Sequence, residues 1–232
     1  MESKPRLLSI LEIVTTLLFV IAVGLVFFYA PMERTMGQVQ RVFYFHVATA
    51  WVGMLGFLAA AVVGVIFLIK KERRWDIAGL AAVEISLVFF LITIISGAIW
   101  ARPSWGTWWT WDPRLTTATI VELVYAAYLM LRQGIEDPDR RARFGAVYSI
   151  LGFISVPITF ISIRLLRTIH PVLFGGNGEE AKGDFSMEPE MFQTFMFSLL
   201  TFSLIFVTLF WNRIRLGRLA DKVEHLRLKM MH

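Results

Sequence analysis

The residues best suited to chemistry in this sequence are a group of tryptophans and two of the four histidines. Five of the eight tryptophans fall within residues 100–113, a segment that also carries Gly, Pro and Ser. An indole buries a large rigid face and keeps one N–H donor, so this cluster predicts a flat aromatic platform in a loop. His46 ends the run Phe-Tyr-Phe-His, and His170 precedes Pro171. Either imidazole could bind a metal or form a hydrogen bond between helices.

The composition defines the class of protein that must position these residues. Apolar residues make up 56% of the 232 positions and charged residues only 18%, values typical of an integral membrane protein. Six segments have the roughly 20 apolar residues that a spanning helix needs. They are residues 7–30, 43–69, 77–101, 115–131, 144–163 and 192–211. We therefore predict an all-α bundle of six transmembrane helices over residues 1–211, without a cleaved signal peptide, followed by a basic tail over residues 212–232.

The distribution of Lys and Arg predicts the orientation of the bundle, because these residues accumulate on the cytoplasmic side of membrane proteins. With the N-terminus inside, sixteen of the 23 basic residues fall in inner segments and seven in outer segments. Both termini are therefore expected to be cytoplasmic, and the tryptophan-rich loop between spans three and four faces outward. His46 and His170 share that outer side, whereas His225 and His232 lie on the inner side. The net charge of +5 follows from this bias and gives no reason to expect nucleic acid.

Local signals place the helix ends around these residues. Asp112 is a good N-cap and Pro113 suits the first helical position, so the fourth span begins directly after the tryptophans. Arg114 then sits at the positive end of a helix dipole, which points to an anionic ligand group. The alternatives are that Arg114 reaches lipid headgroups and that the tryptophans form an interfacial belt. Pro157 should kink the fifth span, and His170 is expected where that helix ends.

Several other features have two interpretations each. Glu84, inside the third span, is either a structural hydrogen-bond partner or neutral, and Glu122 either orients a site group or pairs with a neighbour. The loop 175–190 is either a lid or docking surface, or a solvated linker. The tail is expected to form a short basic helix on the inner leaflet or against a cytoplasmic partner.

Two outer imidazoles, an aromatic platform and outer arginines are together suited to holding haem. Histidine is an axial ligand of haem iron, indoles stack on the porphyrin, and guanidinium groups pair with the propionates. The sequence has no cysteine, which excludes disulfides, thiolate metal sites and covalent haem attachment through C-x-x-C-H. Zinc would require three or four convergent ligands, and no phosphate-binding loop for ATP is present.

The run from Trp105 to Thr116, W-G-T-W-W-T-W-D-P-R-L-T, resembles the tryptophan-rich WWD signature of membrane proteins that handle haem. Its D-P-R-L-T ending resembles the CcmC family, the haem exporter C proteins of cytochrome c maturation. Phe-Tyr-Phe-His at the start of span two and His-Pro after span five extend the resemblance over nearly the whole chain. The resemblance implies axial haem ligands at His46 and His170, propionate partners at Arg41 and Arg114, and a haem platform of Trp100, Trp105, Trp108, Trp109, Trp111 and Asp112.

The resemblance also implies a function. Such a protein holds haem b as transient cargo at the outer, periplasmic face of the cytoplasmic membrane and delivers it to a CcmE-like haem chaperone. Its expected partners are ABC transporter ATPase and permease subunits similar to CcmA and CcmB, and a small one-span subunit similar to CcmD. It is expected to be a transfer factor rather than an enzyme. The alternatives are a WWD-type cytochrome c synthase component and a b-type haem membrane anchor subunit.

Overall fold

The computed structural model describes residues 4–34, 36–171 and 187–230. Most of the loop 175–190, whose role was left open, therefore lies outside the described residues. The elements in chain order are α1 (Arg6–Gly24), the π-helical turn η1 (Leu25–Tyr29), the 3-10 turn η2 (Gln38–Gln40), α2 (Arg41–Lys70), α3 (Arg73–Trp105), α4 (Pro113–Gln133), α5 (Pro138–Phe153), α6 (Ser155–Leu165) and α7 (Pro189–Met230).

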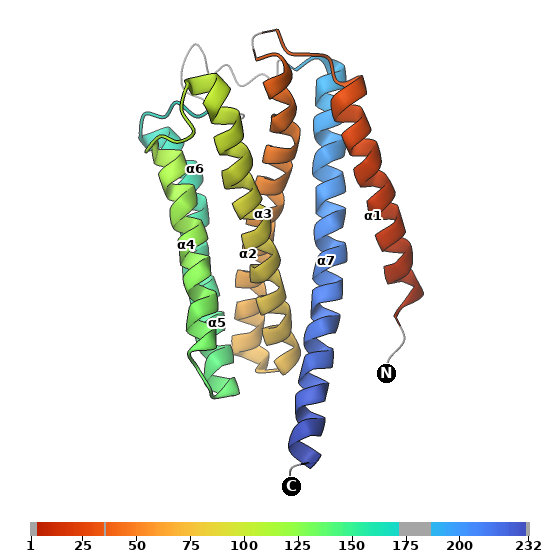
Figure 1. Ribbon diagram of the computed structural model, residues 1–232. Helices are drawn as coiled ribbons and strands as arrows, with labels where there is room; N and C mark the ends of the chain where they lie inside the picture. The colour runs from red at the N-terminus through yellow and green to blue at the C-terminus, as the bar shows by residue number, and fades with distance from the viewer. Residues whose placement is uncertain (1–3, 35, 172–186, 231–232) are drawn as a thin grey trace.

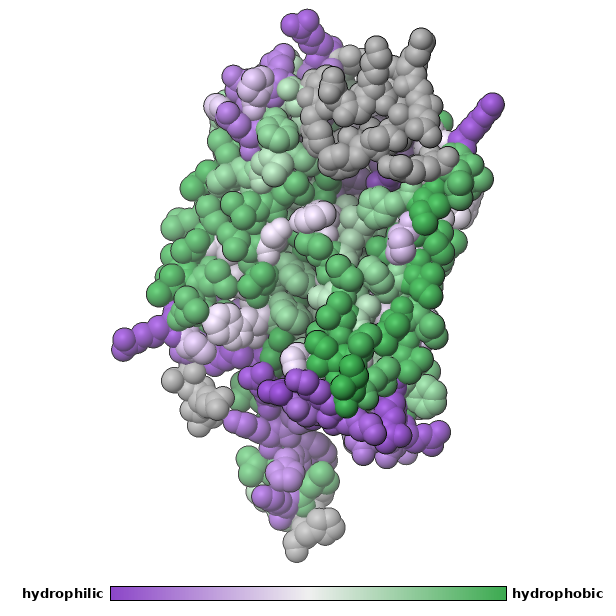
Figure 2. Space-filling model, turned by 180° about the vertical axis from the view of Figure 1, so that it is seen from behind, coloured by the Kyte–Doolittle hydropathy of each residue, from purple (hydrophilic) through white to green (hydrophobic). Residues whose placement is uncertain are grey.

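The helices form one bundle with a common direction (Figure 1). Helices α2 and α3 pack together in the middle, with α1 and α7 on one side and α4, α5 and α6 on the other. Six helical stretches are long and apolar enough to cross a membrane, which confirms the predicted six-span, all-α fold. A wide hydrophobic band lies between hydrophilic residues gathered at the two ends of the molecule (Figure 2).

Small residues on α2 allow α3 to approach closely. A Cβ atom added at Gly56 would lie 1.9 Å from the Ser86 hydroxyl, and one added at Gly53 would lie 3.1 Å from the ring of Phe90. Membrane helices associate through such backbone contacts because apolar side chains gain little by leaving lipid. The α2–α3 crossing therefore depends on glycine at these positions, and it fixes the register between the two helices that carry one side of the site.

An aromatic cluster connects this pair to α4. The rings of Phe57 and Tyr125 stack with centroids 3.9 Å apart and planes 10° apart. Val121 of α4 and Val156 of α6 are buried against the same cluster. The fifth span breaks at Ile154 between α5 and α6, because Pro157 has no N–H to donate to the carbonyl of Phe153. The interruption lies one turn before Pro157, the position where the sequence predicts a kink.

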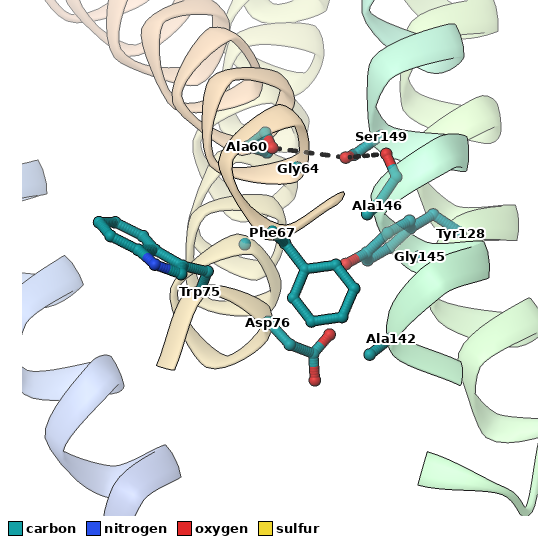
Figure 3. A pocket seen from close by; sticks show the side chains of 11 residues that line it. Ala60, Gly64, Phe67, Trp75, Asp76, Tyr128, Ala142, Gly145, Ala146 and Ser149 are labelled. Atoms are coloured by element: carbon teal, nitrogen blue, oxygen red, sulfur yellow. Dashed lines mark hydrogen bonds between the residues drawn. The ribbon is translucent and has the colours of Figure 1, made fainter. Parts of the chain in front are cut away.

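The end of the bundle away from His46 contains a buried ion pair. Both Asp76 carboxylate oxygens accept hydrogen bonds from the Arg132 guanidinium, at 2.6 and 3.0 Å, and Arg73 adds a third at 2.6 Å. A cavity beside Asp76, shown in Figure 3, has a volume of about 10 Å³ and is lined by residues such as Gly64 and Tyr128. A cavity of that size holds no more than one water molecule, so it is not a binding site for a larger ligand.

Helix α7 extends well past the bundle toward the C-terminus (Figure 1). Arg213 holds it to α3 through two contacts with Glu84, at 2.6 and 2.9 Å. Glu84 is therefore a structural partner, one of the two roles expected for it. The tail differs from the expected separate short helix, because residues 212–230 continue the axis of α7 without a break.

Candidate functional site

His46 projects from the second turn of α2 toward α3. Its Nδ1–H donates to the backbone carbonyl of Thr93 at 3.0 Å, and the Ser96 hydroxyl lies 3.1 Å from the same nitrogen. A carbonyl only accepts, so the proton of the neutral ring is on Nδ1 and the lone pair is on Nε2. Ligand histidines in metal sites are fixed in this way by a second partner on the other ring nitrogen. His46 is thus held in the tautomer that can bind a metal through Nε2.

Gly97 forms the wall behind this ring. A Cβ atom added there would lie 2.9 Å from His46 Cε1, closer than real Cβ contacts allow. The absence of a side chain at position 97 therefore permits the Cε1 edge of the ring to approach α3 closely. Thr93, Ser96 and Gly97 were not predicted from the sequence, because their relation to His46 depends on the α2–α3 register.

Asp112 joins the start of α4 to the segment that carries His170. One carboxylate oxygen caps α4 by accepting from the backbone N–H of Arg114 at 2.9 Å, and it also accepts from the Thr168 hydroxyl at 2.7 Å. The other oxygen accepts from the backbone N–H of Ile169 at 2.8 Å. The predicted N-cap is therefore confirmed, and the same side chain also positions the residues before His170.

His170 lies five residues beyond α6, which ends at Leu165 rather than at the histidine. Its Nδ1–H donates to the carbonyl of Pro171 at 2.9 Å, which leaves Nε2 with the lone pair. Burial, and secondarily the charge of Arg114, lower the pKa of His170 to about 3. The imidazole is therefore neutral at neutral pH, as metal binding requires.

The topology brings the two predicted histidines together. The ring centroids of His46 and His170 are 6.3 Å apart and the ring planes differ by 36°. The ring of Trp105 lies against His170 with a centroid distance of 6.4 Å. No cluster of three or more His, Cys, Asp or Glu side chains suited to a metal ion occurs within the described part of the chain. The pair of imidazoles is therefore the candidate metal site at this end of the bundle.

The tryptophans differ from the expected flat platform in a loop. Trp100 and Trp105 belong to the last turns of α3, which continues through Pro103 and ends at Gly106, a residue with a φ of 74°. The ring planes of Trp100 and Trp105 are perpendicular, and their ring centroids are 5.2 Å apart. Trp109 and Trp111 form a second edge-to-face pair at 6.0 Å. Edge-to-face geometry is favoured by the ring quadrupoles, so the indoles form two angled pairs rather than one plane.

The non-helical half of the segment is open to its surroundings. Trp108 is 58% exposed and Trp111 is 80% exposed. A hollow of about 360 Å³ lies between residues 110–113 and residues 167–169, and neither histidine lines it. The two halves of the segment therefore differ in environment, since Trp105 contacts His170 while Trp111 points outward.

The two predicted arginines lie in the first turns of α2 and α4. The Arg114 guanidinium lies 5.6 Å from the Phe160 ring centroid, and its charge acts on His170. The Arg41 guanidinium lies 5.3 Å from the ring centroid of Phe27, and its Nε is buried without a hydrogen-bond partner among the described residues. An unpaired buried donor of this kind is uncommon in folded proteins. Arg41 is therefore suited to meeting an anionic group.

Other buried polar atoms near this end also have no partner within the described ranges. They are Oε1 of Gln40, whose side chain is 3% exposed, the hydroxyl of Tyr44 and Oγ1 of Thr110. Gln40 directly precedes Arg41. A polar residue at the start of an apolar segment is the sequence feature that could have identified Gln40. Oε2 of Glu122, about two turns into α4, is likewise buried without a hydrogen-bond partner among the described residues.

These features define a six-span helical membrane protein with two imidazoles, 6.3 Å apart, beside an aromatic segment at one end. The family model of the Heme exporter protein C family matches residues 1–229. Heme exporter protein C of Rhodobacter capsulatus is 30% identical over 97% of this chain and 92% of the relative. The Bradyrhizobium diazoefficiens protein of the same name is 30% identical over 86% of this chain and 74% of the relative. That of Escherichia coli K12 is 28% identical over 82% of this chain and 74% of the relative. The chain belongs to the Heme exporter protein C family.

Proposed function

We propose that this chain binds haem between His46 and His170 and delivers it during cytochrome c maturation. The observation that carries the proposal is the 6.3 Å separation of the two ring centroids. With metal–imidazole bonds of about 2 Å, two axial imidazoles have ring centres about 6 Å apart. Each Nδ1 is engaged with a carbonyl, so both Nε2 atoms are available to iron.

The surrounding groups fit the rest of the haem. Arg114 and Arg41 supply the cations for two propionates, and Nε of Arg41 is a buried donor without a hydrogen-bond partner among the described residues. The indole of Trp105 supplies an apolar surface beside His170. Haem is cargo here, so this chain's task is to hold it reversibly and leave one edge accessible. Trp108 and Trp111, both exposed, are the proposed contact surface for the recipient protein.

The proposed recipient is a haem chaperone similar to CcmE, as the family resemblance implies. The relatives are named exporters, which supports assembly with ABC transporter subunits similar to CcmA and CcmB and with a CcmD-like one-span subunit. We place the site on the periplasmic side of the cytoplasmic membrane, from the distribution of Lys and Arg. The chain acts as a transfer factor rather than an enzyme, and haem b is the proposed cargo.

Haem retention is tested with protein purified in detergent from cells that make haem. The wild type should show a haem absorption spectrum, and His46→Ala and His170→Ala should each shift the spectrum and lower the haem content. His225→Ala, an exposed histidine at the opposite end of α7, is the matched control. Unchanged spectra and haem content in both site variants would rule out the paired-ligand assignment.

Delivery requires a separate measurement. The chain is co-expressed with a membrane-anchored haem chaperone and the transporter subunits, and covalent haem on the chaperone is quantified. Loading should be lost in both histidine variants and retained in His225→Ala. A wild type that retains haem but never loads the chaperone would contradict delivery while leaving haem binding intact.

A further inference from the structure

The C-terminal part of α7 has an exposed face that the bundle does not cover. Its contacts with the bundle include Gly217 against Ile77 and an ion pair between Asp221 and Arg73 at 3.0 Å. Beyond Asp221 the described residues of the helix are all exposed as far as Met230. The helix therefore projects past the end opposite the histidine pair (Figure 1).

Apart from Leu228, which lies on the opposite side of the helix, the large apolar side chains along this projection follow a regular spacing. They are separated alternately by three and four residues, and every one is exposed, from 39% at Leu219 to 81% at Met230. At 100° per residue they form a stripe roughly 80° wide, the narrow a/d seam of a coiled coil. Gly217 and Asp221, which contact the bundle, lie outside this stripe. The seam consists of Leu216, Leu219, Val223, Leu226 and Met230.

The positions that flank the seam carry positive charge. With Leu216 at position a, the g positions are Arg215, Lys222 and Lys229, and Arg227 occupies an e position. Residues at e and g set partner choice in coiled coils through charge. A second copy of this chain is disfavoured, because Lys222 would face Arg227 in a parallel pair and basic g positions would face one another in an antiparallel pair.

The shape of the tail also argues against a lipid surface as its occupant. A helix that lies on a membrane has a wide apolar face and turns into the plane of the bilayer. This tail has a narrow seam and continues the axis of a spanning helix without a break. Its geometry and charge are suited to a protein helix instead.

We propose that residues 215–230 dock a helix of another protein, one with an apolar a/d seam and Asp or Glu at its e and g positions. The interaction is independent of the ligand at the opposite end of the bundle. Such pairing buries five exposed apolar side chains and places acidic groups opposite Arg215, Lys222, Arg227 and Lys229.

The absence of cysteine from the chain permits a direct test in the full-length protein. Val223→Cys places a thiol on the seam, and Leu228→Cys places one on the opposite side of the same helix. The probe is a three-heptad peptide with Leu at a and d, Glu at e and g, and one Cys at its central a position. In a glutathione redox buffer the peptide should form several-fold more mixed disulfide with Val223→Cys than with Leu228→Cys, because docking raises the local thiol concentration.

Charge specificity is tested with a second peptide that carries Lys in place of Glu. It should lose the preference for Val223→Cys, and adding Lys222→Glu and Arg227→Glu to that variant should restore the preference for the Lys peptide. Equal reaction at the two sites, or with both peptides, would overturn the proposal. So would disulfide dimers of Val223→Cys, which indicate a second copy, or a blue-shifted fluorophore at position 223 in phosphatidylglycerol vesicles, which indicates lipid.

Discussion

The carboxylate of Asp112 accepts a hydrogen bond from the backbone N–H of Ile169 at 2.8 Å, linking positions 57 residues apart. The same side chain caps α4 and accepts from the Thr168 hydroxyl. His170 follows directly, and its backbone N–H donates to Thr168 Oγ1 at 3.1 Å. One carboxylate thus fixes both the start of a spanning helix and the extended segment that brings His170 to His46.

Asp112→Asn should separate these two roles. Asn is also a good N-cap, so α4 should still begin at Pro113. The amide nitrogen, however, replaces one acceptor oxygen and faces a donor, which costs about 1–3 kcal/mol for a buried group. We expect lower haem content and a shifted haem spectrum at nearly unchanged helicity, measured by absorption and circular dichroism. Asp137→Asn, which alters the same Asp-Pro cap at the start of α5, is the matched control. An equal effect of both variants would contradict a positioning role for Asp112.

Gly97→Ala should displace the His46 ring. The new methyl group would lie 2.9 Å from Cε1, so the ring has to shift to make room for it. Overpacking of this kind costs about 1–3 kcal/mol, and loss of ligand orientation lowers metal affinity by about 10- to 100-fold. Haem titration of the purified protein measures the change.

Gly79→Ala is the control for that variant, since it adds the same methyl group to α3 at a position where the nearest atom is 3.7 Å away. It should leave both haem affinity and thermal stability nearly unchanged. Wild-type haem affinity in Gly97→Ala would show that the wall behind His46 is not needed.

The sequence was sufficient for features that depend on local chemistry. Apolar segment length predicted the six spans, the Asp112-Pro113 pair predicted the start of α4, and Pro157 predicted the break in the fifth span. Each of these follows from the backbone needs of one segment, which no neighbouring helix has to supply. The pairing of His46 with His170 also agrees with the predicted topology, because one lies near the start of α2 and the other beyond the end of α6, at the same end of the bundle.

Features that depend on contact between helices were not predictable in the same way. The partners of His46 at Thr93 and Ser96 follow from the register that Gly53 and Gly56 allow between α2 and α3. The tryptophan segment was expected to be a loop because of its Pro and Gly residues. Helix α3 nevertheless continues to Trp105, since a proline near a helix end loses one hydrogen bond without breaking the last turn.

The buried ion pair at the other end should matter for stability rather than for haem. Asp76→Ala would leave the Arg132 guanidinium, 7% exposed, without its carboxylate, which costs about 3–5 kcal/mol. Thermal unfolding in detergent should show a clearly lower midpoint, while the folded protein keeps the wild-type haem spectrum. Glu72→Ala removes the partner of Arg74 in an exposed pair and should change stability by less than about 1 kcal/mol. A haem spectrum altered in Asp76→Ala would indicate coupling between the two ends.

The two halves of the tryptophan segment should respond differently to truncation. Trp105 contacts the His170 ring, so Trp105→Ala removes an apolar wall of the haem site and should lower haem retention. Trp111 is 80% exposed, so Trp111→Ala should retain haem and, if this edge receives the chaperone, reduce loading of the chaperone several-fold. Haem content of the purified variants and covalent haem on the co-expressed chaperone separate the two effects. Parallel loss of both readouts in Trp111→Ala would place its indole against haem itself, because an exposed docking residue affects transfer without affecting retention.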